Sequence, residues 1–220
     1  MRVLVGCEES QAVTIEFRKL GVEAFSCDIQ ECSGGHSEWH FQQDIFEVID
    51  KGWDMMIAFP PCTYLSFAGN GYFDINKYGE KAIDRWYKRV DAMKFFMDLY
   101  NSKIKHIAIE NPMGFPFSAF RKPDQTIEPY YFGDDDKKRT CLWLNNLPKL
   151  QHNKTNDLFS TKTHIDKPEP IYIGKNGQKY YKTDAISGTS KKGKIERSKT
   201  FPGIAKAMAT QWTEYLKQTI

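Results

Sequence analysis

Two short stretches of the sequence carry side chains that could do covalent chemistry. Cys62 follows two prolines directly after the apolar run 53–59, and Glu110 ends the apolar run 104–110. A cysteine thiolate is a strong nucleophile, and a carboxyl group at the end of a strand can hold or deliver a proton. Each residue also has a structural alternative: Cys62 as a small buried hydrophobic side chain, and Glu110 as an acceptor for neighbouring backbone N–H groups.

Residues at the ends of two earlier runs could hold a nucleoside. The run 2–6 ends at Gly6 and continues through Glu8, and the run 22–29 has Asp28 near its end. In an open parallel sheet, ligands bind outside the carboxyl ends of the strands, where a carboxylate can accept hydrogen bonds from a ribose. No glycine triad follows Gly6, so the chain lacks a dinucleotide-binding fingerprint. Alternatively, Gly6 is an ordinary turn residue and Asp28 closes a loop.

Short apolar runs alternate with helix-forming segments along the first half of the chain. This alternation with short connections is typical of a doubly wound α/β fold, with a mostly parallel sheet and helices on both faces. The polar residues that end the strands are therefore expected along one edge of the sheet. Strands are expected at 2–6, 22–29, 53–59 and 104–110, and helices at 10–20, 44–51 and 79–101.

The expected helices have caps or apolar stripes. Ser10 and Asp44 can cap the first two helices, and Gly21 can end the first. A C-terminal helix is expected at 203–218, after Pro202. Apolar residues recur at helical spacing in the two longest helices: Ala82, Trp86, Val90, Met93, Met97 and Tyr100 in one, and Ile204, Met208, Trp212 and Tyr215 in the other.

The second half of the chain changes character. Strands are expected at 128–132 and 140–144, on either side of an acidic and basic loop, and residues 145–200 show no clear helical periodicity. We interpret them as a long excursion with a small sheet around 171–173. Residues 161–200 carry ten lysine and arginine residues against four acids. This excess favours a polyanionic partner, and the alternative is a solvated lysine-rich loop.

Composition bounds the class of protein. The chain has 220 residues, 40% hydrophobic, which suits one globular domain with an elaboration. No window approaches 18 uninterrupted apolar residues, and the N-terminus lacks the form of a signal peptide, so we expect no membrane span. Five cysteines in no repeated spacing favour free thiols in a reducing cytoplasm. Cys27, Cys32, His36 and His40 have the residue types of a zinc site with the wrong spacing for a finger, so no metal is expected.

The local order of residues adds a resemblance. The run AFPPCTYLSFAGN (58–70) resembles the Pro-Cys nucleophile motif of DNA cytosine 5-methyltransferases, and AIENP (108–112) resembles their Glu-Asn motif. Residues 130–148 and 198–212 resemble a compact, bacteriophage-encoded subset of that family. The resemblance implies a Rossmann-like methyltransferase core at 1–145 and 200–220. It also implies that the basic excursion at 146–199 is a reduced target-recognition region.

The resemblance implies S-adenosylmethionine as cofactor, DNA as partner and cytosine C5 as the methylated atom, with the host cytoplasm as location for a phage protein. The target base would be single-stranded or flipped from a duplex. Catalysis would fall to Cys62, Pro61, Glu110 and Asn111. The cofactor would contact Gly6, Cys7, Glu8 and Ser10 with its methionine part, Asp28 with its ribose, Ile29, Asp44 and Ile45 with its adenine, and Pro60. Ser66, Lys138, Arg139, Thr140, Lys191 and Lys192 would contact the substrate.

The sequence also departs from the family pattern. Glu8-Glu9 stands where the first motif is usually richer in glycine, and Lys138-Arg139-Thr140 is the nearest match to a missing Gln-x-Arg-x-Arg motif. About 55 residues remain for target recognition, which makes sequence-specific recognition of a duplex doubtful. Two alternatives follow: an enzyme that modifies a nucleotide or RNA, and a catalytically degenerate protein that binds nucleic acid or a host protein. The oligomeric state stays open.

Overall fold

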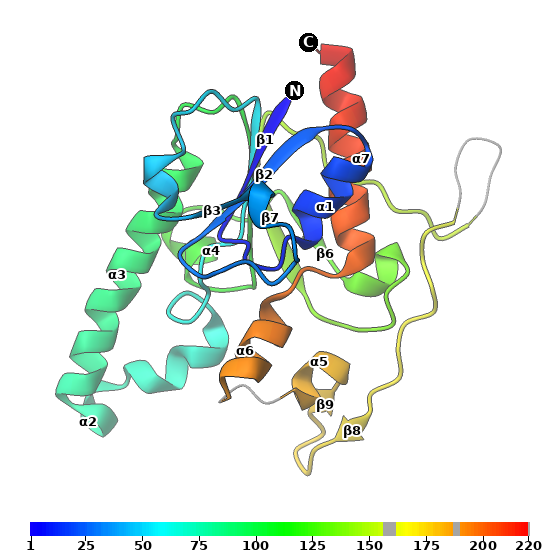
Figure 1. Ribbon diagram of the computed structural model, residues 1–220. Coiled ribbons are helices and arrows are strands. Elements are labelled where there is room, and N and C mark those ends of the chain that lie inside the picture. Colours follow the sequence, from blue (N-terminus) through cyan, green and yellow to red (C-terminus); the bar gives the residue numbers. More distant parts are fainter. Residues whose placement is uncertain (156–161, 187–189, 220) are drawn as a thin grey trace.

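The computed structural model describes residues 1–155, 162–186 and 190–219. A seven-stranded sheet with the order β3-β2-β1-β4-β5-β7-β6 forms its centre (Figure 1). Within the described residues, a separate two-stranded hairpin pairs β8 with β9. The strands are β1 (Arg2–Gly6), β2 (Glu23–Asp28), β3 (His40–Gln42), β4 (Met55–Ala58), β5 (His106–Asn111), β6 (Gln125–Ile127), β7 (Thr140–Asn145), β8 (Tyr172–Ile173) and β9 (Lys179–Tyr180).

Strand pairing confirms the expected sheet, and its register aligns the carboxyl ends of the central parallel strands. β1 to β5 pair in parallel, and β7 is antiparallel to both β5 and β6. Gly6 pairs with Cys27 on one side and with Ala58 on the other, and Ala58 pairs with Ile109. The residues that follow these four positions therefore lie next to one another along the carboxyl edge.

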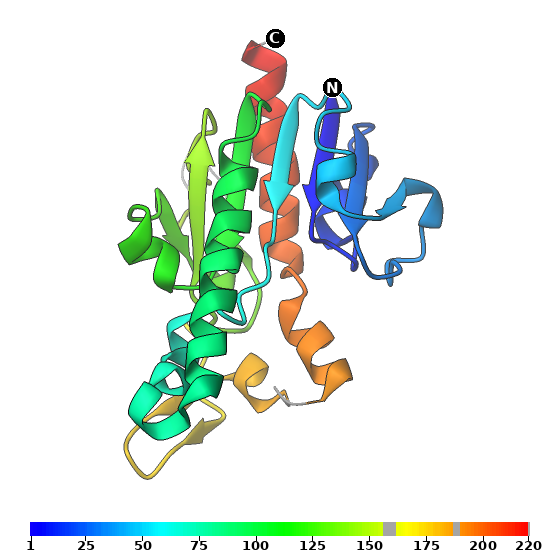
Figure 2. The same ribbon diagram turned by 90° about the vertical axis from the view of Figure 1, so that its left-hand side faces the viewer.

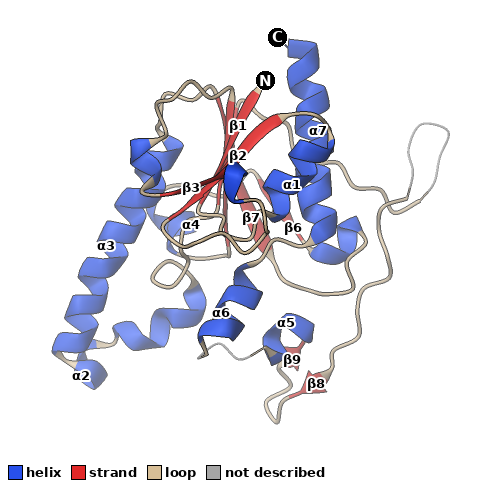
Figure 3. Cartoon of the chain, viewed as in Figure 1, coloured by secondary structure: helices blue, strands red, loops and turns tan. Residues whose placement is uncertain are grey.

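Helices cover both faces of the sheet, as expected (Figure 3). Helices α1 (Ala12–Lys19) and α7 (Pro202–Thr219) pack on one face, where Phe17 and Trp212 are fully buried. Helix α3 (Glu80–Tyr100) packs on the other face, with Phe96 against Trp143 at a centroid distance of 5.3 Å. Because the strands are buried on both faces, their sequences are continuous apolar runs.

Two groups of shorter elements extend beyond the carboxyl ends of the strands (Figures 1 and 2). One comprises η3 (Phe67–Phe73) and α2 (Ile75–Tyr78) at the start of α3; the other comprises α5 (Lys182–Ala185), α6 (Lys191–Ser198) and the β8–β9 hairpin. The remaining helices are η1 (Ser37–Trp39), η2 (Ile45–Glu47), α4 (Phe115–Ala119) and η4 (Pro129–Phe132).

Three sequence predictions were wrong in detail. Residues 128–132 form η4, and the strand lies before them at β6, because Pro129 cannot donate to a ladder and begins a helical turn. Helix α6 lies in the excursion, which was expected to be irregular. In α3, the predicted stripe residue Val90 is 60% exposed, and the neighbouring Arg89 is buried instead.

The start of α1 also differs from the prediction. Ser10 does not cap the helix; Gln11 occupies the N-cap position in a left-handed conformation, and its side chain accepts no hydrogen bond from the helix N–H groups. No helix in the described part of the chain is both long and apolar enough to traverse a bilayer.

Candidate functional site

The residues after β4 and β5 form the centre of the site. We call residues 59–66 the nucleophile loop, because Cys62 lies in it and is exposed. The Asn111 side-chain amide donates a 2.8 Å hydrogen bond to the carbonyl of Pro60, and the Phe59 N–H donates to the carbonyl of Gly6 at 3.0 Å. The end of β5 therefore fixes the start of the nucleophile loop.

The middle of the nucleophile loop is held from α3. The Arg85 guanidinium donates to the Thr63 carbonyl at 3.0 Å, and the Arg89 Nε donates to the Tyr64 carbonyl at 2.8 Å. These two residues directly follow Cys62. Because the bonds use backbone carbonyls, they fix the path of the loop and leave the cysteine side chain available.

Arg89 was not recognised in the sequence as part of the site. It is 4% exposed, and its guanidinium lies 3.4 Å from the centroid of the Phe73 ring. Burial and the nearby Arg85 lower the pKa of Arg89. A second bond joins its Nη2 to the Asn70 side chain at 2.7 Å. The sequence gives no sign of this burial, because an arginine beside the predicted apolar stripe of a helix is ordinarily exposed.

The end of the nucleophile loop packs against the residues after β5. Ser66 forms an isolated bridge with Gly114, and the Phe115 N–H donates to the Leu65 carbonyl at 2.6 Å. A Cβ atom on Gly114 would lie 2.1 Å from the Leu65 carbonyl oxygen, so only glycine permits this approach. Ser66, predicted as a substrate contact, thus takes part in fixing the loop through its backbone.

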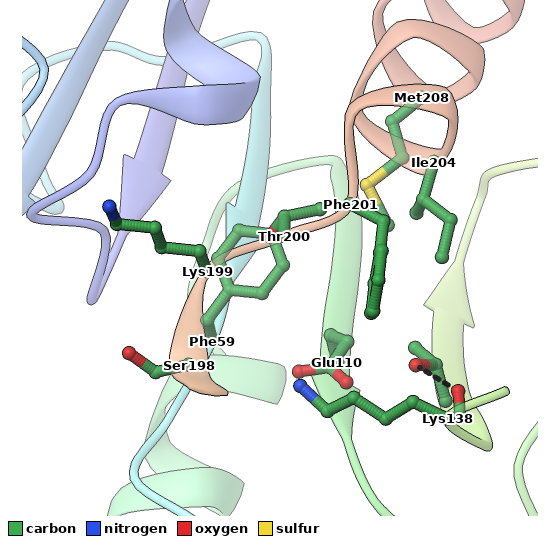
Figure 4. A pocket seen from close by; sticks show the side chains of 10 residues that line it. Phe59, Glu110, Lys138, Ser198, Lys199, Thr200, Phe201, Ile204 and Met208 are labelled. Carbon is green, nitrogen blue, oxygen red and sulfur yellow. Dashed lines mark hydrogen bonds between the residues drawn. The ribbon is translucent and has the colours of Figure 1, made fainter. Parts of the chain in front are cut away.

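A small pocket of about 20 Å³ adjoins Glu110 (Figure 4). Phe59, Lys138 and Phe201 line it, and the Lys138 ammonium lies beside the Glu110 carboxylate (Figure 4). Burial raises the pKa of Glu110, and the positive charge of Lys138 opposes that rise. A carboxyl group in this state can donate a proton near neutral pH more readily than an exposed one.

The thiol of Cys62 responds to the same charges. Although the residue is exposed, the atoms packed around its sulfur desolvate the thiolate, which is the main reason that the pKa of Cys62 is raised; the Glu110 carboxylate raises it further. Lys138 and Arg197 act in the opposite direction. The predicted pair, Cys62 and Glu110, therefore shares one electrostatic environment, with Lys138 acting on both.

The predicted substrate residues of β7 and the loop before it have different positions. The Lys138 ammonium donates to the Arg197 carbonyl at 2.7 Å, and Thr140 lines the Glu110 pocket. Arg139 points elsewhere, with its Nε 3.9 Å from the Glu128 carboxylate and its side chain 60% exposed. The side chains of Lys191 and Lys192 lie outside the described part of the structure.

The predicted nucleoside residues lie along the same edge, beside β1. The Asp28 carboxylate accepts from the Gln30 N–H at 2.8 Å, and Ile29 is 78% exposed. Asp44 caps η2 by accepting from the Phe46 N–H at 2.9 Å, as predicted. Ile45 is 5% exposed, and its side chain fills the space where Gly6 lacks a Cβ. The side chain of Ile45 therefore packs tightly against the end of β1.

Glu8 also has a different role from the one expected. Its carboxylate accepts from the Val13 N–H at 2.6 Å and from the Thr14 hydroxyl at 2.7 Å, which caps α1 from inside the protein. Burial is the main reason that the pKa of Glu8 rises from 4.5 to about 7. The carboxylate is thus occupied by the helix and does not face the edge of the sheet.

Cys7 and Gln11 share this inner loop. Both adopt a φ of 58°, and Gln11 is fully buried. The Gln11 amide donates to the Ser26 hydroxyl and the His36 carbonyl, and its oxygen accepts from the His36 N–H. Burial raises the pKa of Cys7 well above its usual range. These contacts give the loop its shape and make Cys7 a poor nucleophile.

A larger cavity, of about 600 Å³, lies between the start of α1 and the excursion. Ser10 and Ser33 border it on the core side; Arg197, Lys199 and Thr200 border it on the other. Its volume suits a small organic ligand. Lys199, Thr200 and Phe201 line both cavities; the sequence gave them no role, although they lie in the segment 198–212 that resembles the phage-encoded proteins.

Three aspartates of the loop before β7 attach neighbouring segments. Asp134 accepts from the Gly203 N–H at the start of α7 at 2.9 Å. Asp135 pairs with Lys182, and Asp136 accepts from the N–H and hydroxyl of Thr183 in α5. The acidic run therefore connects the excursion to the core.

The cysteine and histidine group considered for zinc is dispersed into other contacts. His40 bonds to the Ser26 hydroxyl at 2.8 Å and to the Gln30 carbonyl, and the Cys27 thiol donates to the Gln43 carbonyl. Among the described residues, no group of three or more histidine, cysteine, aspartate or glutamate side chains is arranged to hold a metal ion.

Comparison with solved structures identifies the fold. The methyltransferase EhMeth of Entamoeba histolytica superimposes with a TM-score of 0.53 at 12% sequence identity, over 98% of each chain. This chain has the fold of a methyltransferase. The Rossmann-like architecture expected from the sequence is thereby confirmed. No protein-family description matches the chain, and no curated protein matches it in sequence.

Proposed function

We propose that this protein transfers a methyl group from S-adenosylmethionine to C5 of cytosine in DNA, through a covalent adduct on Cys62. The observation that carries the proposal is the shared environment of Cys62 and Glu110, at the ends of adjacent parallel strands in a methyltransferase fold. A nucleophile, a buried carboxyl group and a cation at one strand edge match the needs of this reaction.

The covalent step explains the need for a thiol. The Cys62 thiolate adds to C6 of cytosine, forming an S–C6 bond, and the C5–C6 π electrons move to C5. When bound, S-adenosylmethionine would supply the electrophilic methyl group for C5, and its sulfonium would leave as a thioether. Loss of the C5 proton to a base then restores the C5–C6 double bond and expels the thiolate.

Glu110 and Asn111 support that step differently. Protonated Glu110 can donate to N3 of the cytosine and so stabilise the charge that develops on the ring during addition. The raised pKa of Glu110 favours the protonated form. Asn111 holds Pro60 and thereby fixes the loop that presents Cys62.

The residues at the edge fit the proposed cofactor in part. We assign the ribose to Asp28 and the adenine to the exposed Ile29, and the cavity of about 600 Å³ reaches Ser10 and Thr200. Gly6 is the last residue of β1 at the same edge, and Asp44 lies after β3, at the N-cap of η2. The Glu8 carboxylate is bonded to the start of α1, and the Ile45 side chain packs against Gly6.

DNA is the proposed partner, with the target base unpaired or flipped. Arg197 of the excursion lines the larger cavity and supplies positive charge there. The five cysteines are all free, which suits a reducing cytoplasm.

The test is incubation of the full chain with labelled S-adenosylmethionine and DNA, followed by nucleoside analysis. We expect 5-methylcytosine from the wild type and none from Cys62→Ala, which should still bind the cofactor in calorimetry. Methylated RNA or nucleotide, or cofactor binding without transfer to any substrate, would support the alternatives. A fully active Cys62→Ala protein would falsify the covalent mechanism.

A further inference from the structure

Beside the nucleophile loop, aromatic rings and cations alternate on the protein surface. Tyr64, Arg85, Tyr72, Tyr78 and Lys77 form this group, which we call the aromatic–cation row. The Arg85 guanidinium lies 5.0 Å from the Tyr64 ring centroid and 5.4 Å from that of Tyr72. The Tyr72 and Tyr78 centroids are 5.7 Å apart, and the Lys77 ammonium lies 5.2 Å from the Tyr78 ring.

The row begins at the proposed reaction centre. Tyr64 is two residues after Cys62, and Arg85 binds the carbonyl of Thr63 between them. From there the row follows η3 and α2, which extend past the carboxyl ends of the strands (Figure 1). A chain-like ligand that places one unit at Cys62 would lay its next units along this row.

The row reaches solvent, and its cations have no carboxylate partner. Tyr72 is 58% exposed and Lys77 is exposed, whereas Tyr64, Tyr78 and Arg85 are half-buried. Among the described residues, no carboxylate lies within ion-pair distance of Arg85 or Lys77, since Asp74 accepts from backbone N–H groups of α2 and Asp84 pairs with Lys88 at 2.7 Å. The buried Nε of Arg85 has no hydrogen-bond partner. The row therefore combines free ring surface with uncompensated positive charge.

We propose that the aromatic–cation row binds unpaired nucleotides that adjoin the target base in a single-stranded nucleic acid. Bases stack on exposed tyrosine rings whatever their sequence, and cations between the rings hold the phosphates. A paired base is already stacked on both sides, so a duplex cannot use the rings in this way. The proposal rests on the proposed function for the identity of the target base, but not for the binding itself.

Equilibrium binding of a fluorescent single-stranded oligodeoxynucleotide to the full chain tests this proposal. Tyr72→Ala and Tyr78→Ala should each weaken binding about 10-fold, the size expected for one lost stacking contact. Tyr87→Ala is the matched control: Tyr87 is a 69% exposed tyrosine of α3, outside the row, and its removal should leave binding unchanged. A strand with abasic nucleotides beside the cytosine should bind wild type and Tyr72→Ala equally.

The outcomes separate the two proposals. Unchanged single-strand binding in both row variants, or an equal loss in Tyr87→Ala, would overturn the row as a nucleotide site. Loss of duplex binding equal to the loss of single-strand binding would overturn its preference for unpaired bases. If the wild type methylates no cytosine but the row variants still bind single strands more weakly, the proposed function fails and the row stands.

Discussion

The nucleophile loop and the loop after β1 both leave the same sheet edge, but they use polar side chains in opposite ways. Other elements hold the nucleophile loop: Asn111 and two arginines of α3 bind its carbonyls, and Cys62 stays exposed. The loop after β1 holds itself, because Glu8 and Gln11 turn inward to bind α1 and the segment near His36. One loop presents a reactive group, and the other provides a fixed surface.

Two acidic residues at this edge show that a residue's position in a motif does not by itself decide its chemical role. Glu8 and Glu110 are both acidic residues at the carboxyl edge, and burial raises the pKa of both. The Glu8 oxygens accept hydrogen bonds from N–H groups of α1, whereas Glu110 lines a pocket beside Lys138. Of the two, only Glu110 lines a pocket, which is why the proposed mechanism uses it.

The largest expected effect concerns Glu110→Gln. Loss of the carboxyl proton donor should lower the rate of methyl transfer about 1,000-fold. Whenever Glu110 is ionised, its negative charge raises the pKa of Cys62; glutamine never carries that charge, so more thiolate forms at neutral pH. Alkylation of Cys62 by iodoacetamide should therefore become faster as methyl transfer is lost. Slower alkylation would contradict the shared environment of the two residues.

A smaller effect is expected for Arg89→Ala. The change removes two hydrogen bonds of a charged group and leaves a cavity beside Phe73, so the free energy of unfolding should fall by about 4 kcal/mol. Urea denaturation measures it. Lys88→Ala, which removes only an exposed ion pair, is the control and should change stability by less than about 1 kcal/mol. Equal losses in the two variants would show that α3 does not hold the nucleophile loop.

The buried Glu8 in the loop after β1 should make the free energy of unfolding depend on pH. The pKa of Glu8 is about 7 in the folded protein and 4.5 when unperturbed, so the folded state binds more protons between these values. Stability should fall as pH rises from about 4.5 to about 7, by about 3 kcal/mol. In Glu8→Gln this fall should be absent in urea denaturation at the two pH values. Identical pH dependence of stability in wild type and variant would show that Glu8 does not bind this proton.

The sequence predicted the sheet well for a physical reason. Strands buried on both faces must be continuously apolar, so β1, β4 and β5 stood out as short runs bounded by glycine or proline. The ends of the runs at β4 and β5 located Cys62 and Glu110, and the end of the run at β2 located Asp28. Periodicity likewise found α7, whose Ile204, Met208 and Trp212 are buried.

What the sequence missed depends on tertiary contacts. The buried position of Arg89 follows from the rings around it, which no local pattern reveals. Helix α6 has a lysine-rich sequence with a glycine, and it is attached to the core through Lys138 and the Arg197 carbonyl. The inward turn of Glu8 requires the left-handed residues on either side of it, which the sequence did not indicate.

The proposed methyl transfer depends on a covalent bond between Cys62 and cytosine C6. An oligodeoxynucleotide with 5-fluorocytosine tests it most directly, because fluorine at C5 cannot leave as the proton does and the adduct cannot release the enzyme. With S-adenosylmethionine present, the intact mass should rise by one oligonucleotide and one methyl group in the wild type and stay unchanged in Cys62→Ala. A wild-type protein that methylates ordinary cytosine, yet forms no adduct with the fluorinated strand, would contradict the account.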